Sequence, residues 1–363
     1  MEDFKNILQS IGNLSLEEIF ILEEHLSSKK TKEKQEIYSS ISEQVDQCPH
    51  CHSEAVIKWG NYKGMDRYMC KNCKRTFIPT TGTAVHRLKK PDIFLNFATV
   101  MLSEGFNSLK AEAERVGISK TTAFEWRHRL LVSLGSGAPG YNGITEIDDI
   151  WFRYSQKGRK GLKYGRKRGR SSHRGDNGYQ TKLLITKERE GALDMSVVTI
   201  GRLSEQDISG KLGGKFGDDA VIMSDSHPSI KKFSNTENVK HESFIAKSHV
   251  KDKTCHVQTV NQLASTIKDR VNHRLRGVST KYLQNYATWL SVMEKYKSTK
   301  GKVKEIVILS LSNIKAWDMH TNIEKLYEQF ILNHSTRTYR CPVKKEWKSQ
   351  NWNFENAKTG VFI

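Results

Sequence analysis

The chain has 363 residues, 37% of them hydrophobic, so it is too long for one ordinary domain and can bury a sizeable core. Its formal net charge of +19 attracts polyanions, and nucleic acid is a better partner than an anionic membrane surface, because no long basic amphipathic helix is present. The most apolar stretch, residues 306–311, is far below the roughly 20 residues of a membrane span, and no signal peptide is recognisable, so we expect a cytoplasmic, nucleoid-associated protein.

Residues 1–44 are predicted to be helical. Apolar side chains recur at helical spacing near the start, at Phe4, Ile7, Leu8 and Ile11. The sequence Ser15-Leu16-Glu17-Glu18 has the pattern of a capping box and predicts a second helix through Leu26. The charged run KKTKEKQE that follows is either a solvated linker or an exposed helix face.

Residues 45–86 contain two C-x-x-C pairs, Cys48/Cys51 and Cys70/Cys73, with 18 residues between them. In a cytosolic chain this spacing favours zinc over disulfides, and four thiolates leave no open coordination position. We therefore predict a structural zinc ribbon whose second pair is delivered by a hairpin strand, against the alternative of incidental buried thiols. Cys255 and Cys341 have no partner in the sequence and are expected to be ordinary thiols.

Residues 87–135 are predicted to contain a helix-turn-helix. Gly117 supplies the turn, Ser119 caps the second helix, and the apolar residues of both helices face inward: Leu109, Ala113, Val116, Ala123, Trp126 and Leu130. The opposite face of the second helix is expected to point into a DNA major groove, and it carries Lys120, Thr121, Arg127 and Arg129. The alternative is a helical hairpin that only packs.

Residues 140–298 change to short β-rich runs: ITEIDDIWF, KLLITKE, LDMSVVTI and DAVIMSD. Helices are predicted from Thr254 to about Leu275 and from Thr280 to Tyr296. Strands with interspersed and following helices indicate an α/β domain with a mixed sheet, within a chain that is multidomain α+β overall. No role is assigned to residues 299–363.

Three segments of this domain could converge on a metal site. Asp148 lies in a predicted strand, Asp225 ends another, and Asn261 shares a polar helix face with Lys268. Two-metal phosphoryl transfer needs hard oxygen ligands from separate elements. The residues alone leave alternatives open, because Asp149 or Glu146 could replace Asp148, and an Asp at a strand end is often only a helix cap.

A basic segment between Ser155 and Asp176 contains no acidic residue before its end. Such a run is often a solvated loop. Here it follows Asp148, and its glycines and arginines could track a DNA backbone. The residues expected to contact DNA are Arg166, Lys167, Arg168 and Arg170.

From about Cys48 to Leu290 the chain resembles the bacterial insertion-sequence transposases that have an N-terminal zinc ribbon and a DDE domain, including the ISXO-like elements. The resemblance rests on CPHC…RYMCKNCKRTF, TTGTAVHRLKKP, KTTAFEWRH, EIDDIW, MSDSHPSI and HVQTVNQLASTIKDRV, in that order. Asp225 and Asn261 have 35 residues between them, an interval found in many such enzymes.

The resemblance implies an RNase H-like catalytic domain that cleaves and joins DNA with Mg²⁺ or Mn²⁺. Asp148, Asp225 and Asn261 match the three metal-ligand positions and Lys268 matches a basic position seven residues on, while Asn261 departs from the commoner Glu. His241 and His256 match positions where histidine is frequent. Expected partners are double-stranded DNA of the element ends and target, and a second copy in a homodimer or larger synaptic complex. A non-catalytic zinc-ribbon/helix-turn-helix DNA-binding regulator is the alternative.

Overall fold

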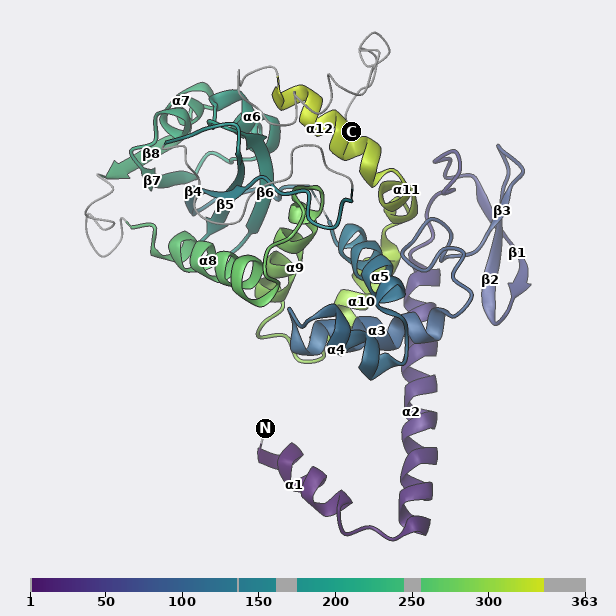
Figure 1. Cartoon of the computed structure of the whole chain (residues 1–363). Coiled ribbons are helices and arrows are strands. Elements are labelled where there is room, and N and C mark those ends of the chain that lie inside the picture. The colour runs from purple at the N-terminus through teal and green to yellow at the C-terminus, as the bar shows by residue number, and fades with distance from the viewer. Residues whose placement is uncertain (1, 136, 161–174, 245–255, 336–363) are drawn as a thin grey trace.

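The computed structural model describes residues 2–135, 137–160, 175–244 and 256–335. Two helices, α1 (Glu2–Ile11) and α2 (Leu16–Glu43), confirm the predicted helical start. The capping box is formed, since Glu18 N donates to Ser15 Oγ (3.2 Å) and Ser15 N donates to Glu18 Oε2 (2.7 Å). Helix α2 continues through the charged run, so that run is a helix face. Figure 1 shows α2 projecting from the body with α1 at its far end.

A small antiparallel sheet follows, with its strands in the order β1 (Val56–Tyr62), β2 (Met65–Cys70) and β3 (Thr76–Phe77). Tyr62 pairs with Met65, so a two-residue turn joins β1 to β2. Lys63 (φ 50°) and Gly64 (φ 80°) both have positive φ, as a type I′ turn requires. The predicted hairpin is confirmed, and β2 ends at the second cysteine pair.

Helices α3 (Pro91–Glu104), α4 (Leu109–Val116) and α5 (Lys120–Ser133) form one packed unit. Between α4 and α5 the left-handed Gly117 (φ 71°) reverses the chain, and the Ser119 side chain accepts the N–H of Thr122. The C-terminal helices complete this unit: α10 (Lys302–Ser312) packs on α2, α3 and α5, and α11 (Ala316–Thr321) packs on α5.

The larger sheet has the strand order β6-β5-β4-β7-β8. Its strands are β4 (Ile144–Arg153), β5 (Gln180–Glu188), β6 (Leu193–Ile200), β7 (Val221–Asp225) and β8 (Lys240–Phe244). Strands β6, β5 and β4 are antiparallel neighbours, whereas β4, β7 and β8 are parallel. The mixed α/β architecture is confirmed. Strand β8 was not predicted, because KHESF is short and polar.

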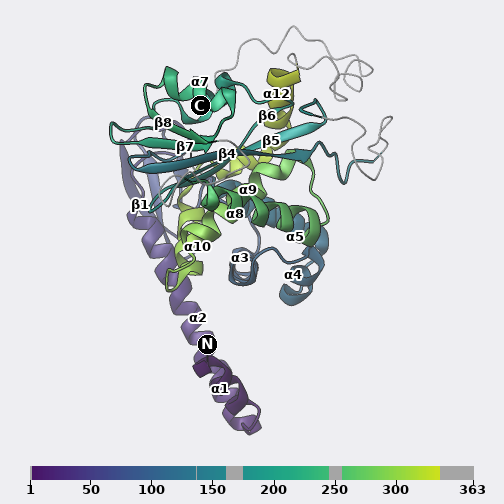
Figure 2. The same cartoon turned by 90° about the vertical axis from the view of Figure 1, so that its left-hand side faces the viewer.

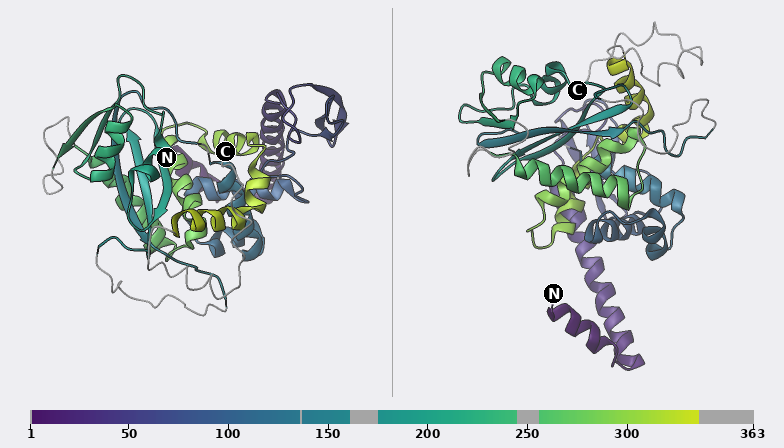
Figure 3. Two further views of the ribbon diagram at one scale, coloured as in Figure 1. Left: turned by 90° about the horizontal axis from the view of Figure 1, so that it is seen from above. Right: turned by 60° about the vertical axis from the view of Figure 1, so that its left-hand side comes forward.

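Helices cover both faces of this sheet (Figures 2 and 3). One face carries α8 (Gln258–Lys268) and α9 (Leu283–Lys295), and the other carries α6 (Glu205–Leu212) and α7 (Pro228–Thr236). Strand β4 alternates between them: Ile150 packs in the core on the α8 side and Ile147 in the core on the α7 side. Within the described ranges, no helix combines the length and apolar character that a membrane crossing needs.

The predicted helix from Thr254 to Leu275 is shorter and irregular. Helix α8 ends at Lys268 and passes directly into a π-helix, Asp269–Arg274. A short 3₁₀ turn, Thr280–Tyr282, precedes α9. The last described helix, α12 (Ile323–Ser335), contacts β6, and its His334 Nδ1 lies 3.1 Å from Thr199 Oγ1.

Candidate metal and DNA-binding sites

Asp148 and Asp225 lie side by side on adjacent parallel strands. The parallel register pairs Ile144 with Val221 and Glu146 with Met223, and the same offset, continued two residues further, places Asp148 beside Asp225. Residues directly opposite each other on neighbouring strands point to the same face. Asp148 and Ile150 are two residues apart and therefore point to the same face of β4. Ile150 packs in the core on the α8 side, so Asp148 also faces α8.

The electrostatics of this pair favour a cation. Burial, followed by the carboxylates of Asp225 and Asp149, raises the pKa of Asp148 to about 7 against the opposing effect of Lys268. The Oδ1 atom of Asp225 is buried and has no hydrogen-bond partner in the described part of the chain. An unsatisfied buried carboxylate oxygen is costly. Mg²⁺ and Mn²⁺ prefer carboxylate oxygens, so these residues fit such an ion.

Asn261 and Lys268 lie on α8, the helix that packs on β4 and β5. Lys268 interacts electrostatically with Asp148 and lines a groove of about 430 Å³ together with Arg153 and Asn272. Asn261 is partly exposed, and its side chain makes no hydrogen bond to another described residue. The structure therefore brings Asp148, Asp225 and Lys268 together and places Asn261 on the helix that packs on β4 and β5.

Asp149, an alternative to Asp148, points to the opposite face of β4. Its carboxylate lies 2.8 Å from Lys182 Nζ, which also pairs with Asp176 at 2.8 Å. His227 Nε2 is 3.9 Å away on the same face. Asp149 is thus held in an ion-pair network within the fold.

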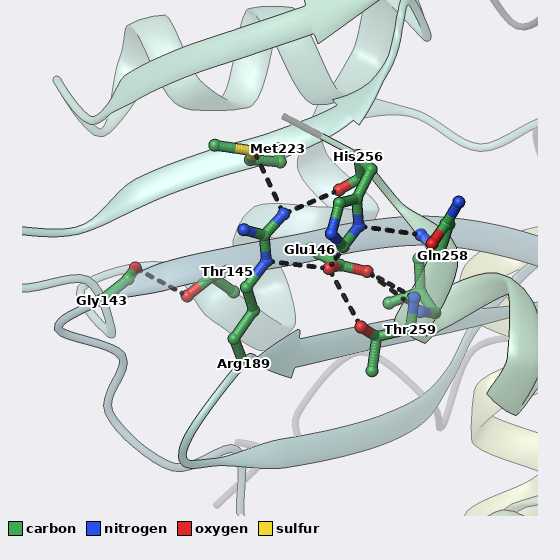
Figure 4. Close-up of polar contacts among 9 residues, drawn as sticks. Gly143, Thr145, Glu146, Arg189, Met223, His256, Gln258 and Thr259 are labelled. Atoms are coloured by element: carbon green, nitrogen blue, oxygen red, sulfur yellow. Dashed lines mark hydrogen bonds and ion pairs between the residues drawn. The ribbon is translucent and has the colours of Figure 1, made fainter. Parts of the chain in front are cut away.

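Glu146, the other alternative, is fully buried and binds the start of α8 (Figure 4). Its carboxylate accepts hydrogen bonds from Thr259 and Val260 and pairs with Arg189. Sequence reasoning did not assign this role. Two features of the sequence could have indicated this role of Glu146. It lies two residues before Asp148, and Val257, which precedes α8, has no side chain that could cap the helix.

The four cysteines of the two pairs form one cluster. All four Sγ atoms lie within 4.8 Å of one another, with Cys48–Cys73 at 3.7 Å and Cys51–Cys70 at 3.6 Å. A tetrahedral zinc ion at about 2.3 Å from each sulfur separates the sulfurs by about 3.8 Å. A hydrogen bond from the backbone N–H of Cys73 lowers the pKa of Cys70 to about 6. The geometry fits structural zinc. Cys255 and Cys341 lie outside the described residues.

The predicted DNA-facing side of α5 requires a correction. Lys120 and Thr121 are exposed at its N-terminus, but Arg127 and Arg129 are only 1% and 4% exposed. Arg127 Nη2 donates to Glu112 (2.5 Å) and to the Asn107 carbonyl (2.9 Å). Arg129 donates to the His86 carbonyl, and its guanidinium lies 4.5 Å from the Trp317 ring.

The physical reason is the enclosure of α5 by α3, α9, α10 and α11. Even His128 is buried between these helices, where it stacks on Tyr282 at 3.8 Å. The exposed residues of α5 are Lys120 and Thr121 in its first turn and the acidic Glu125 in its second. Arg127 and Arg129 are therefore structural residues in this arrangement.

The basic segment is described only at its ends. Arg166, Lys167, Arg168 and Arg170 lie outside the described residues. Near its start, Lys157 Nζ donates to the carbonyls of Leu275 (3.0 Å), Arg276 (3.2 Å) and Gly277 (2.6 Å). The segment therefore leaves the sheet from a point fixed to the end of the π-helix.

Comparisons with known proteins agree with the geometry of the larger sheet and its helices. Residues 141–291 match the ISXO2-like transposase domain. A curated relative, an uncharacterised protein in transposable element ISH50 of Halobacterium salinarum, is 33% identical over 129 residues. That match covers 34% of this chain and 42% of the relative, so the chain spans less than half of the relative's length.

Solved structures give weaker likenesses. A pre-cleavage Mos1 transpososome is 10% identical with a TM-score of 0.24, over 65% of this chain and 77% of that chain. The Mos1 strand transfer complex is 12% identical with a TM-score of 0.26, over 68% and 78%. These scores are too low to establish a common fold.

Residues 141–291 thus match a transposase domain and are built around a mixed sheet with two adjacent carboxylates. The resemblance predicted from the sequence is confirmed for these residues, which match the ISXO2-like transposase domain.

Proposed function

We propose that the chain is a DNA transposase that binds the terminal inverted repeats of an insertion sequence and catalyses metal-dependent cleavage and strand transfer. The observation that carries this proposal is the pair Asp148 and Asp225, on adjacent strands of a transposase-family domain. The strand order β6-β5-β4-β7-β8, with its antiparallel and parallel halves, supports an RNase H-like assignment.

In this proposal Asp148, Asp225 and Asn261 hold Mg²⁺ or Mn²⁺. Such an ion, when bound, activates water or a DNA 3′-hydroxyl and stabilises charge on the phosphorus oxygens. Lys268, which interacts electrostatically with Asp148 and borders the groove, would bind the phosphate of the scissile strand. Neither carboxylate needs to form a covalent bond to DNA.

The DNA-binding role falls to the N-terminal modules and the basic segment. The zinc ribbon and the α4–α5 helix-turn-helix would recognise the element ends, and the exposed Lys120 and Thr121 at the start of α5 would contact DNA. Contacts with the DNA phosphates that do not depend on the DNA sequence would come from Arg166, Lys167, Arg168 and Arg170.

Two rival functions are separated by one series of assays. A DNA-binding regulator would bind end DNA without cutting it, whereas a nuclease would cut without joining. We expect nicking of inverted-repeat DNA only with Mg²⁺ or Mn²⁺, followed by joining of a supplied 3′-hydroxyl end to target DNA. Specific binding without any metal-dependent nicking would establish the regulator instead.

Asn261 gives a sharper test, because an amide oxygen coordinates metal without contributing charge. Asn261→Ala is expected to lose most cleavage and to need more Mn²⁺ for what remains. Asn261→Glu would keep or tighten metal use if the longer side chain fits. The measurement is the cleavage rate against metal concentration, with Gln262→Ala on the exposed neighbouring position as the control. Wild-type strand transfer by Asn261→Ala at limiting Mg²⁺ would eliminate the ligand role.

Self-association would follow from the need to pair two DNA ends, and the N-terminal arm (residues 2–26) offers a surface for it. Its apolar side chains lie open to solvent, with Leu16 at 86% and Phe20 at 69% exposure. The arm has one lysine against six acidic residues, Glu2, Asp3, Glu17, Glu18, Glu23 and Glu24, in a chain of net charge +19. Its negative charge repels DNA and complements the basic remainder of a second copy.

We therefore expect Leu16→Glu combined with Phe20→Glu to convert a dimer into a monomer. Two charges in the apolar surface would oppose its burial between copies. The measurement is the molar mass from light scattering after gel filtration. Ser27→Glu with Ser28→Glu is the matched control, since it adds the same charge to exposed polar positions of α2. An unchanged mass in the apolar variant would exclude the arm as the interface.

A further inference from the structure

The first turn of α8 is capped by a residue far away in the sequence. Val257 precedes the helix and cannot supply a side-chain acceptor, yet the first N–H groups of a helix need partners. Glu146 Oε2 on β4 accepts from Thr259 N (2.9 Å) and Val260 N (3.2 Å). Glu146 Oε1 also accepts from Thr259 Oγ1 (3.1 Å) (Figure 4). A strand thus provides the cap for Thr259 and Val260, whereas the preceding Gln258 N donates to the nearby His256 Nδ1 (3.4 Å).

The buried charge of Glu146 is balanced within the same cluster. The side chain is 0% exposed, and Arg189 Nε lies 3.1 Å from its Oε1. The positive end of the α8 dipole also favours a carboxylate there. Arg189 Nη2 donates to the His256 carbonyl (3.3 Å) and lies 3.8 Å from Met223 Sδ. Arg189 therefore joins the start of α8 to both β4 and β7.

Each proposed metal ligand lies two residues after a member of this cluster in the sequence. Glu146 is two residues before Asp148 on β4, and Met223 is two residues before Asp225 on β7. Thr259, held by Glu146, is two residues before Asn261 on α8. Any shift of α8 against the two strands would move Asn261 relative to both carboxylates. The polar contacts of Glu146 and Arg189 resist such a shift, in addition to the apolar face of α8 that packs in the core.

We propose that Glu146 and Arg189 are positioning residues that fix Asn261 relative to Asp148 and Asp225. They act through the placement of α8 and do not touch metal or DNA. The inference rests on the proposed metal site and adds the device that holds its third ligand. Outer residues that orient metal ligands typically change metal affinity by about 10- to 100-fold when replaced.

The test uses Glu146→Gln in the full chain without DNA. Gln keeps the shape but presents one acceptor oxygen and an NH₂ group that conflicts with the helix N–H donors. We expect Mn²⁺ affinity, measured by titration calorimetry, to fall by about tenfold or more. Amide hydrogen exchange of residues 259–261 should become faster, a local change that general destabilisation would not confine to this turn. Thr259→Val, which removes one hydrogen bond to Glu146, should weaken Mn²⁺ binding less.

Glu188→Gln is the matched control. Glu188 also accepts backbone N–H groups, from Asn142, Gly143 and Ala192, but its described contacts do not include α8. Unchanged Mn²⁺ affinity and exchange in both Glu146→Gln and Thr259→Val would overturn the positioning role. Unchanged Mn²⁺ affinity in Asp225→Asn would instead show that the proposed metal site is wrong. If Glu146→Gln fails to fold, Thr259→Val alone decides.

Discussion

Replacing Asp225 with Asn is expected to reduce cleavage of end DNA by about three orders of magnitude or more. Asn keeps the size of the side chain but removes one of two adjacent negative charges, and a metal clamp contributes several kcal/mol to phosphoryl transfer. Asp148→Asn should behave in the same way, because both carboxylates face α8. The measurement is the single-turnover cleavage rate at saturating Mn²⁺.

The control for this result is Asp218→Asn, which changes an exposed acid outside strand β7. We expect the loss in Asp225→Asn without unfolding, because the substitution removes a carboxylate that raises the pKa of Asp148. The melting temperature of the metal-free protein should therefore be at least that of wild type. Wild-type cleavage by Asp225→Asn would remove this carboxylate from the mechanism and leave the transposase proposal without its metal site.

Cys70→Ser is expected to eliminate bound zinc, which we predict at about one ion per chain. Structural zinc contributes roughly 10–16 kcal/mol to the folding of small modules, and three sulfurs leave the tetrahedron incomplete. The β1–β2–β3 unit should unfold and end binding should weaken, while the larger sheet keeps its structure. Metal analysis of freshly purified, reduced protein and far-UV circular dichroism provide the measurements.

The matched control for the zinc site is Cys341→Ser, which changes a thiol outside the two C-x-x-C pairs. It should retain zinc and end binding. Freshly purified wild-type protein without zinc would refute the assignment, and the four close sulfurs would then be a thiol cluster only.

The strands that carry Asp148 and Asp225 were predictable because each is an apolar run whose periodicity is set locally. The sequence predicted that the segments carrying the two carboxylates converge on one site. It could not predict that the two residues are neighbours, because this depends on the parallel register of β4 with β7. Local pattern alone also could not separate Asp148 from Asp149. The two residues point to opposite faces of β4. The packing of α8 determines which of these faces carries the proposed metal site.

The position of the arginines on α5 could not be predicted from helical periodicity. In an isolated pair of helices, the side of α5 that carries Arg127 and Arg129 would be exposed to solvent. The residues that cover it lie far away in the sequence, as Trp289 and Trp317 show. Buried arginines occur where a partner compensates the charge, as Glu112 does for Arg127. Nothing in the local sequence of α4 and α5 reveals that a third layer encloses them.

The packing of α10 against α2, α3 and α5 has a consequence for synthesis on the ribosome. Ile306 and Leu311 are fully buried in the same core as Phe94 and Met101, so that core is incomplete until more than 300 residues have been made. Contacts of such long sequence separation form late, and the nascent N-terminal helices must expose apolar surface meanwhile. A prematurely terminated chain would therefore lack part of the hydrophobic core around α3 and α5, and the N-terminal helices and the larger sheet would mature together.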